Sequence, residues 1–186
     1  MPAHRRKSVP QRASLRRMLV RTRPGDRTKG VLTAGLWHLR VALGRGGVKA
    51  NKHEGDGATP RGDFRLVRLW WRPDRGPRPR TQLPVRRIGP ADAWCEDPAD
   101  RHYNLPVRLS DTQSGDRLLR EDRLYDLIIE LDHNTRPRVA GRGSAVFIHV
   151  ARPGMTPTAG CVALKSEVLR RLLAKLGPRT RIAIGR

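Results

Sequence analysis

The apolar residues of this 186-residue chain occur as short runs, each bounded by glycine, proline or polar turn residues. The clearest runs are residues 124–131 (LYDLIIEL) and 144–150 (SAVFIHV), which are rich in β-branched and aromatic side chains. Further extended segments are expected within residues 14–20, 64–71 and 180–185, and residues 31–44 fit either one long bent strand or a hairpin. This pattern predicts many short strands joined by irregular connections.

Only one segment has the spacing of a helix. In residues 165–177 (KSEVLRRLLAKLG), leucines recur at i, i+3, i+4 and i+7, at Leu169, Leu172, Leu173 and Leu176, and a Gly-Pro pair ends the pattern. Residues 14–186 are therefore expected to form one mainly β domain, a sandwich or barrel-like sheet with a helix near the C-terminus packed on it. Residues 1–13 are polar, basic and interrupted by proline, which predicts a mobile tail.

The formal net charge of +22 raises the question of a polyanionic partner. Basic residues are spread along the whole chain, arginine outnumbers lysine, and no nucleic-acid-binding motif accompanies them, so a specific nucleic-acid partner is not expected. An anionic polymer or surface stays open as a partner. No apolar run approaches the length of about 18 residues that a transmembrane helix needs. The apolar patch at residues 18–20 is too short for a signal-peptide core, so no export signal is visible.

The two cysteines, Cys95 and Cys161, are too few for a disulfide framework and have no neighbours at zinc-ligand spacing. We expect both thiols to be free, with a single bridge between them as the alternative. Asp132, His133 and Asn134 are interpreted as a transition from strand to turn, in which Asp132 and Asn134 bond the local backbone, rather than as metal ligands. No metal and no cofactor are expected.

Cys161 has the surroundings that a nucleophilic cysteine needs. A thiol attacks a carbonyl as the thiolate, so it requires a nearby base and backbone donors for the developing oxyanion. His149 lies near the end of the run 144–150, and Cys161 follows Gly160 in a tight turn whose N–H groups can converge on one point. The alternative is that both side chains are merely buried. Cys95, with His102 nearby, is the weaker candidate nucleophile because no glycine turn leads into it.

Two stretches carry a resemblance to a known family. Residues 147–164 (FIHVARPGMTPTAGCVAL) resemble the signature of the L,D-transpeptidase catalytic domain (YkuD-like) family, in which an upstream histidine and a Ser/Thr-x-Gly-Cys loop form the active site. Residues 55–66 (GDGATPRGDFRL) are similar to the Thr-Pro-x-Gly-x-Phe segment that lies upstream in that family. The resemblance covers roughly residues 15–186. It implies a YkuD-like β fold and a cysteine acyltransferase that acts on peptidoglycan stem peptides.

The resemblance also implies roles for individual residues. Cys161 corresponds to the nucleophile and His149 to the base that activates it. The backbone carbonyl of Val150 falls where family members orient the imidazole. Gly160, together with Cys161, would supply backbone donors to the oxyanion, and Thr158 matches the Ser/Thr position of the loop.

This chain departs from the family pattern at two positions beside the cysteine. Ala159 stands where a second histidine is common, and Ala163 stands where an arginine or asparagine is usual. A guanidinium from Arg152 or Arg142 is a candidate to replace the missing polar group. Tyr103 is a further candidate for contact with the substrate, since long loops over a β scaffold often line sites.

The function that the resemblance implies is that of an L,D-transpeptidase. Such an enzyme forms a thioester with a stem peptide, releases a D-amino acid and passes the acyl group to an amine, giving a cross-link of the 3-3 or 1-3 type. The alternatives are an L,D-carboxypeptidase or endopeptidase that uses the same cysteine, and a basic binding module for an anionic polymer. The family implies a periplasmic or cell-envelope location, a cytoplasmic one stays open because no export signal is visible, and a monomer is expected.

Overall fold

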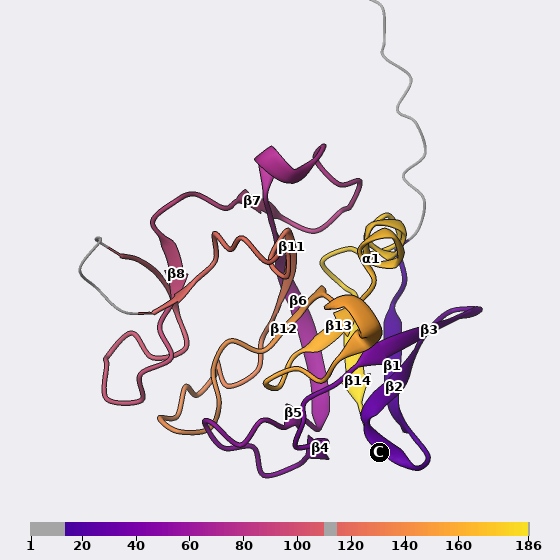
Figure 1. The fold of residues 1–186 in the computed structure, drawn as a ribbon, viewed down its shortest axis with the longest axis horizontal. Coiled ribbons are helices and arrows are strands. Elements are labelled where there is room, and N and C mark those ends of the chain that lie inside the picture. Colours follow the sequence, from indigo (N-terminus) through magenta and orange to yellow (C-terminus); the bar gives the residue numbers. More distant parts are fainter. Residues whose placement is uncertain (1–13, 110–114, 186) are drawn as a thin grey trace, which may run out of the picture.

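The computed structural model describes residues 14–109 and 115–185, so the tail predicted for residues 1–13 lies outside the described residues. The fold is mainly β, as predicted, and it contains one α-helix within the described residues (Figure 1). The longer strands are β1 (Arg17–Arg23), β2 (Asp26–Ala34), β3 (Trp37–Ala42), β6 (Gly62–Trp71), β11 (Leu127–Leu131), β12 (Phe147–Val150) and β14 (Arg181–Ile184). The shorter elements are β4 (Val48–Lys49), β5 (Thr59–Pro60), β7 (Val85–Arg87), β8 (Asp92–Trp94), β9 (Pro106–Arg108), β10 (Asp116–Arg117), β13 (Val162–Leu164), the helix α1 (Ser166–Leu173), and the 3₁₀ turns η1 (Pro73–Arg75) and η2 (Pro153–Met155).

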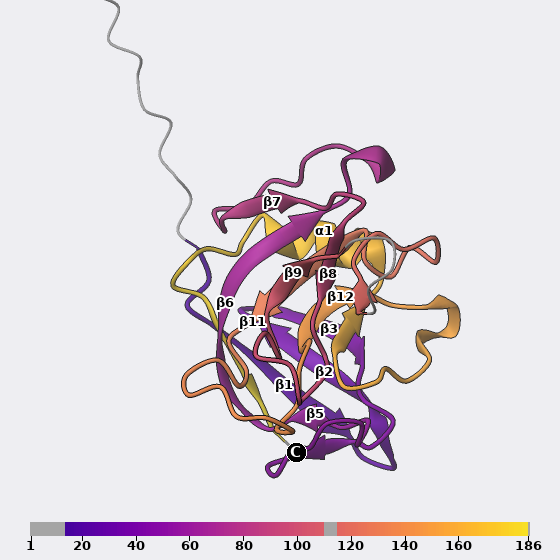
Figure 2. The same cartoon turned by 90° about the vertical axis from the view of Figure 1, so that its left-hand side faces the viewer.

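The main sheet closes into a barrel. Among the described residues its strands follow the order β11-β12-β13-β3-β2-β1-β14-β6-β7, and β11 also pairs with β6, which joins the two sides of the sheet. Closure of this kind satisfies the backbone groups that an open edge would leave unpaired. A small sheet of β10, β8 and β9 lies outside the barrel, on the side of β11 and β12 (Figures 1 and 2).

The segment 31–44, for which a bent strand and a hairpin were both open, lies in a hairpin. β2 and β3 pair antiparallel from Lys29 opposite Ala42 to Ala34 opposite Trp37. The turn between them contains Gly35, whose φ of +61° lies in the left-handed region that glycine adopts without strain.

β12 is buried on both faces, and its alternating side chains enter two different cores. Ile148 and Val150 pack in the barrel interior, whereas Phe147 packs with Trp70, Trp94 and other side chains between the barrel and the small sheet. Because successive side chains of a strand point to opposite faces, His149 lies on the same face as Phe147. The strand therefore presents the histidine to the outer core and not to the barrel interior.

The helix α1 is shorter than the predicted segment 165–177, because it ends at Leu173. Leu169, Leu172, Leu173 and Leu176 are nevertheless all fully buried. The helix lies at the end of the barrel opposite the C-terminus (Figures 1 and 2). The leucine pattern thus correctly predicts which side chains face the core, and it overestimates the helix by the final turn.

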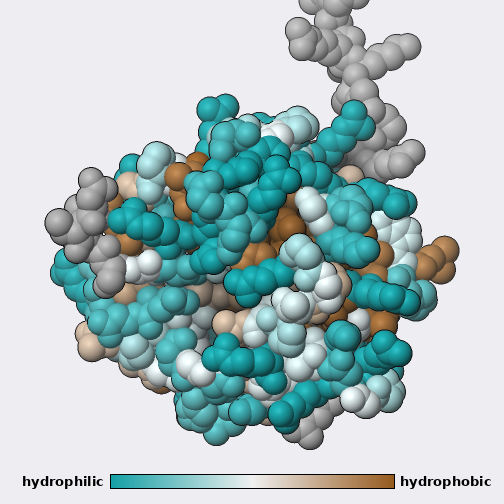
Figure 3. All heavy atoms as spheres, in the orientation of Figure 1, coloured by the Kyte–Doolittle hydropathy of each residue, from teal (hydrophilic) through white to brown (hydrophobic). Residues whose placement is uncertain are grey.

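Hydrophilic residues cover most of the face of the molecule shown in Figure 3. No helix in the described part of the chain is both long and apolar enough to cross a membrane.

Candidate active site

The loop that carries Cys161 is closed by the side chain of Thr158. The hydroxyl of Thr158 donates to the carbonyl oxygen of Cys161 at 2.7 Å and accepts the N–H of Gly160 at 3.1 Å. Two backbone hydrogen bonds of 2.9 Å join Thr158 to Leu43 and Arg45, just after β3. These bonds fix the position of the loop relative to the barrel.

The upstream Thr-Pro segment contacts the same loop. Thr59, which begins β5, accepts the Gly44 N–H at 2.8 Å and donates to the carbonyl oxygen of Cys161 at 3.5 Å, across 102 residues of sequence. Gly160 passes so close to this segment that a Cβ at this position would lie 2.9 Å from the carbonyl oxygen of Ala58. Its φ of +150° is also one that side-chain-bearing residues avoid. The two stretches that carry the family resemblance therefore form one cluster of loops.

The thiol of Cys161 is buried and points at the backbone between Ala145 and Phe147. Sγ donates to the carbonyl oxygen of Ala145 at 3.1 Å and accepts the N–H of Phe147 at 3.4 Å. Burial raises the pKa of the thiol to about 12, and the negative charges of Asp116 and Glu96 act in the same direction. The cysteine is therefore a neutral thiol.

The imidazole of His149 is held by the backbone carbonyl of Val150. Nδ1 lies 2.8 Å from that oxygen, so Nδ1 carries the proton and Nε2 keeps its lone pair. The ring also meets the ring of Tyr125 edge-on, at a centroid distance of 5.7 Å. Burial lowers the pKa of His149 to about 4, so the imidazole is neutral. No hydrogen bond links it to Sγ of Cys161 among the described residues, because the thiol donates to Ala145 instead.

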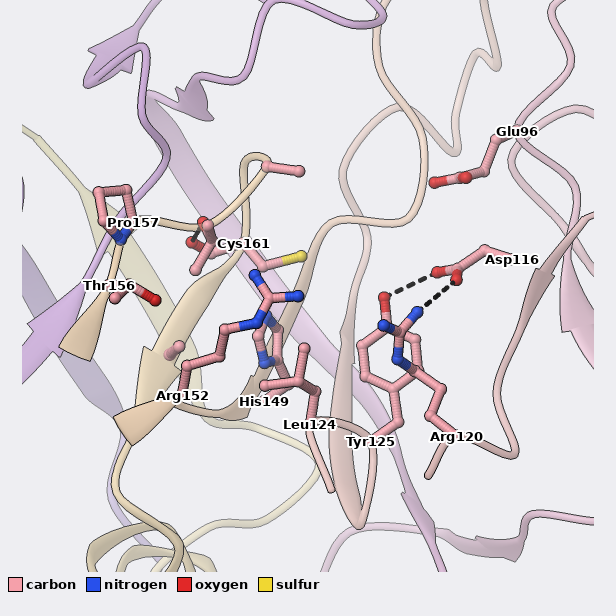
Figure 4. A pocket seen from close by; sticks show the side chains of 13 residues that line it. Glu96, Asp116, Arg120, Leu124, Tyr125, His149, Arg152, Thr156, Pro157 and Cys161 are labelled. Carbon is pink, nitrogen blue, oxygen red and sulfur yellow. Dashed lines mark hydrogen bonds and ion pairs between the residues drawn. The ribbon is translucent and has the colours of Figure 1, made fainter. Parts of the chain in front are cut away.

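Both side chains line a cavity of about 230 Å³ (Figure 4). Arg152 reaches over this cavity from the segment after β12, and its guanidinium lies 3.9 Å from the carboxylate of Asp122. Leu124 also lines the cavity. The cavity is therefore accessible to a substrate that would meet the thiol, an imidazole with a free lone pair and a guanidinium.

A polar network that the sequence patterns did not indicate forms the far wall of this cavity. The hydroxyl of Tyr125 donates to Asp116 at 2.7 Å, and Arg120 contacts the same carboxylate at 3.4 Å (Figure 4). Arg120 also pairs with Asp122 at 2.6 Å. Burial raises the pKa of Asp116, and the bonds from Tyr125 and Arg120 oppose that shift. The network holds Tyr125 against the ring of His149.

A second cavity, of about 240 Å³, lies on the other side of Cys161. It is lined by Lys52 and Glu54 from the Gly-rich connection and by Ser144 and Ala145 before β12. Lys52 pairs with Asp56 at 2.6 Å. The sequence patterns pointed to none of these side chains as site residues, because only the folded loops bring them beside the cysteine.

The structure places beside Cys161 only one of the three side chains predicted from the sequence to contact the substrate. Arg152 lines the first cavity, whereas Arg142 and Tyr103 line neither cavity. Arg142 bonds the side chain of Asn51, and the hydroxyl of Tyr103 donates to Glu54, which itself lines the second cavity. Tyr103 thus supports a side chain in the wall of the second cavity.

Two backbone groups differ in their availability to an oxyanion. The N–H of Gly160 is engaged by the Thr158 hydroxyl and does not point freely into a cavity. The N–H of Cys161 donates no hydrogen bond to the rest of the described chain. Of the two predicted donors, Cys161 is therefore the one whose N–H has no acceptor among the described residues.

Both cysteines are free, as expected, and Cys95 lines neither cavity. No group of three or more His, Cys, Asp and Glu side chains within residues 14–109 and 115–185 is arranged to hold a metal ion. Asn134 bonds the backbone of Val139 and Gly143, as expected for a turn residue, while Asp132 bonds the N–H and the side chain of Arg65.

Comparisons with known proteins bear on the same site. A model of the L,D-transpeptidase catalytic domain matches residues 18–184, which is nearly the whole chain. No curated protein and no solved structure matches the chain. Enzymes of the matched family act on peptidoglycan and are typically associated with the cell envelope. The match, together with a barrel that brings the Thr-Pro segment onto the Gly-Cys loop, shows that the chain belongs to the L,D-transpeptidase catalytic domain family.

Proposed function

We propose that this chain is an L,D-transpeptidase in which Cys161 attacks a peptidoglycan stem peptide and an amine acceptor then resolves the thioester. The observation that carries the proposal is the position of the Cys161 thiol, which lines two cavities and shares one of them with the imidazole of His149. An acyl donor and an acceptor each need a path to the sulfur, and two cavities provide them.

The first step needs a proton transfer, because the thiol and the imidazole are both neutral. As sulfur bonds to the carbonyl carbon, the proton of the thiol passes to Nε2 of His149. The carbonyl of Val150 keeps accepting the Nδ1 proton at 2.8 Å and so stabilises the imidazolium. The imidazolium then protonates the leaving amine, and a D-amino acid departs.

Burial makes an isolated thiolate and an isolated imidazolium costly. The two charges therefore arise together, during attack, and not as an ion pair that exists before the substrate binds. The N–H of Cys161 is the proposed oxyanion donor, and the guanidinium of Arg152 is the proposed replacement for the polar group absent at Ala163.

Intact-mass spectrometry tests this assignment directly. Wild-type protein incubated with a disaccharide-tetrapeptide or a carbapenem is expected to gain one acyl group, and Cys161→Ala is expected to gain none. Cys95→Ala is the matched control, because Cys95 lines neither cavity, and it should be acylated like the wild type. An adduct on Cys161→Ala would contradict the proposal.

The products of the second step separate transfer from hydrolysis. Cross-linked dimers of the disaccharide-tetrapeptide are expected, whereas trimmed monomers alone would indicate the carboxypeptidase or endopeptidase alternative. Water and an amine compete for the same thioester, so the ratio of dimer to trimmed monomer measures how well the site favours the amine. Cross-links of the 3-3 and 1-3 types are then distinguished by fragmentation of the dimer.

A further inference from the structure

The two cavities beside Cys161 share part of their lining. Glu96, Tyr125, Ala159 and Cys161 line both. Glu96 comes from the connection after β8, and its carboxylate points across the first cavity toward the side of Cys161 (Figure 4). A charged side chain thus lies where molecules entering from the two sides would meet.

Glu96 differs from the other carboxylates of the two cavities in having no partner within residues 14–109 and 115–185. Asp116 accepts the hydroxyl of Tyr125 and pairs with Arg120. Glu54 accepts the hydroxyls of Tyr103 and Ser144. Glu96 has no hydrogen bond and no ion pair with any residue that the structure describes.

The lack of a partner is notable because the chain carries a net charge of +22. Three of the cations that line the cavities are paired with other carboxylates, since Lys52 pairs with Asp56, Arg120 with Asp122 and Asp116, and Arg152 with Asp122. Arg45 also lines the second cavity and forms no ion pair with Glu96. Glu96 keeps part of its surface in solvent although the cavity walls desolvate its carboxylate, so a cation that comes with a ligand can reach it.

The charge of Glu96 opposes the first half of the proposed reaction. Together with Asp116, it adds to the burial that raises the pKa of the Cys161 thiol. A carboxylate in this position therefore makes sulfur a poorer nucleophile toward the acyl donor. The same carboxylate would favour the second half of the reaction, in which a positively charged amine must approach the thioester and lose a proton.

The environment also makes Glu96 a better base than an ordinary glutamate. Desolvation by the surrounding walls raises the pKa of Glu96 to about 7, the charges of Asp116 and Glu54 add to the rise, and Arg120 opposes it. The other charged or titratable side chains that line the two cavities are Arg45, Lys52, Tyr125, His149, Arg152 and Cys161. A carboxylate with a pKa near the working pH can both hold an ammonium and accept its proton.

We propose that Glu96 binds the ammonium group of the acyl acceptor and removes its proton, so that the neutral amine can attack the Cys161 thioester. This inference rests on the proposed transpeptidase function. The ligand class is a primary alkylammonium, which is almost fully protonated at neutral pH because its pKa is about 10. One proton passes from the ammonium to the Glu96 carboxylate, and the amine nitrogen then bonds to the thioester carbon. As the carbon–sulfur bond breaks, the second proton of the nitrogen passes through His149 to the departing sulfur, and Glu96 returns its proton to water.

The substitution Glu96→Gln separates the two half-reactions, because it should change them in opposite directions. Removing the negative charge lowers the pKa of the thiol, so acylation by a carbapenem is expected to be faster than in the wild type. Removing the base is expected to lower the ratio of dimer to trimmed monomer about tenfold or more at neutral pH. At about pH 10 a primary amine is largely unprotonated in solution, so the ratio should recover toward the wild-type value.

Glu167→Gln is the matched control, since Glu167 is exposed in the first turn of α1 and lines neither cavity. Both of its readouts should equal those of the wild type. If Glu96→Gln gave the same ratio of dimer to trimmed monomer as the wild type, the inference would be overturned. A fall in both the acylation rate and the transfer rate would also overturn it, because that result indicates a damaged site. A wild-type protein that is acylated but yields only trimmed monomers would overturn it as well. A wild-type protein that is never acylated would instead overturn the proposed function, and this inference with it.

Discussion

The hydroxyl of Thr158 offers a test of how the nucleophile loop is held. Thr158→Val keeps the β-branched shape and removes only the hydroxyl, which is buried and makes two hydrogen bonds. The Gly160 N–H would then lose its acceptor. The carbonyl of Cys161 would keep only the longer bond of 3.5 Å from Thr59.

The expected cost follows from these two groups. A buried donor left without a partner costs about 1–3 kcal/mol, and the lost bond to the carbonyl costs about 1 kcal/mol more. The free energy of unfolding should therefore fall by about 2–4 kcal/mol. For a domain of this size that corresponds to a fall in Tm of roughly 5–15 °C.

Urea unfolding measures this loss, and Thr158→Ser is the matched control. Serine keeps the hydroxyl and lacks one methyl group, so its cost should stay near 1 kcal/mol. The acylation rate of Thr158→Val should fall as well, because the loop positions the thiol. If the valine and serine variants were equally stable, the hydroxyl would not be what closes the loop, and the reasoning would be refuted.

Two further predictions follow from the site. Burial lowers the pKa of His149 to about 4 from the ordinary value of 6.5. The stability linked to this group is complete above pH 6.5 and declines as the pH falls toward 4, by up to about 3 kcal/mol. Urea unfolding across this range should show that loss in the wild type and not in His149→Gln, and parallel curves would argue against it. Gly160→Ala should lower Tm and slow acylation, because its Cβ would meet the Ala58 carbonyl at 2.9 Å and its φ is strained. A fully active, equally stable alanine variant would contradict this.

The sequence predicted those parts of the fold in which local pattern and burial coincide. β11 and β12 lie within the two short apolar runs that indicated strands. The leucine pattern of 165–177 identified the buried side chains correctly, but it placed the end of the helix too late, since Leu176 is buried although α1 ends at Leu173. The leucine spacing indicates which side chains face the core. Leu176 faces the core from the chain that follows the helix, so the spacing continues past the helix end. β13 was not predicted because three residues are too few to show a period.

The residues of the candidate site also fall into those that a local motif predicts and those that only the folded chain brings together. His149 and Cys161 were predicted as a pair because a motif joins them, and the structure places both on one cavity. Tyr125 lies in a predicted strand, but nothing in the sequence indicates that its hydroxyl meets Asp116. Glu96 lies in a segment rich in turn residues, where no period exists to place a side chain. Contacts of this kind depend on which loops come together in the tertiary structure, and no local sequence pattern predicts that.

The burial of β12 on both faces has a consequence for the motions of the site. Its side chains belong to two cores, so the backbone that carries His149 can open only when both cores are disrupted. The amide hydrogens of such segments exchange with solvent only through openings whose free energy approaches that of global unfolding. Glu96 lies in the irregular connection between β8 and β9, where residues 96–102 are all exposed, and exposed loops open at a lower free energy than buried strands. The histidine proposed as proton acceptor for the thiol thus lies on a strand that is anchored in two cores, while the carboxylate proposed for the second substrate lies on an exposed loop that can adjust to acceptors of different shape.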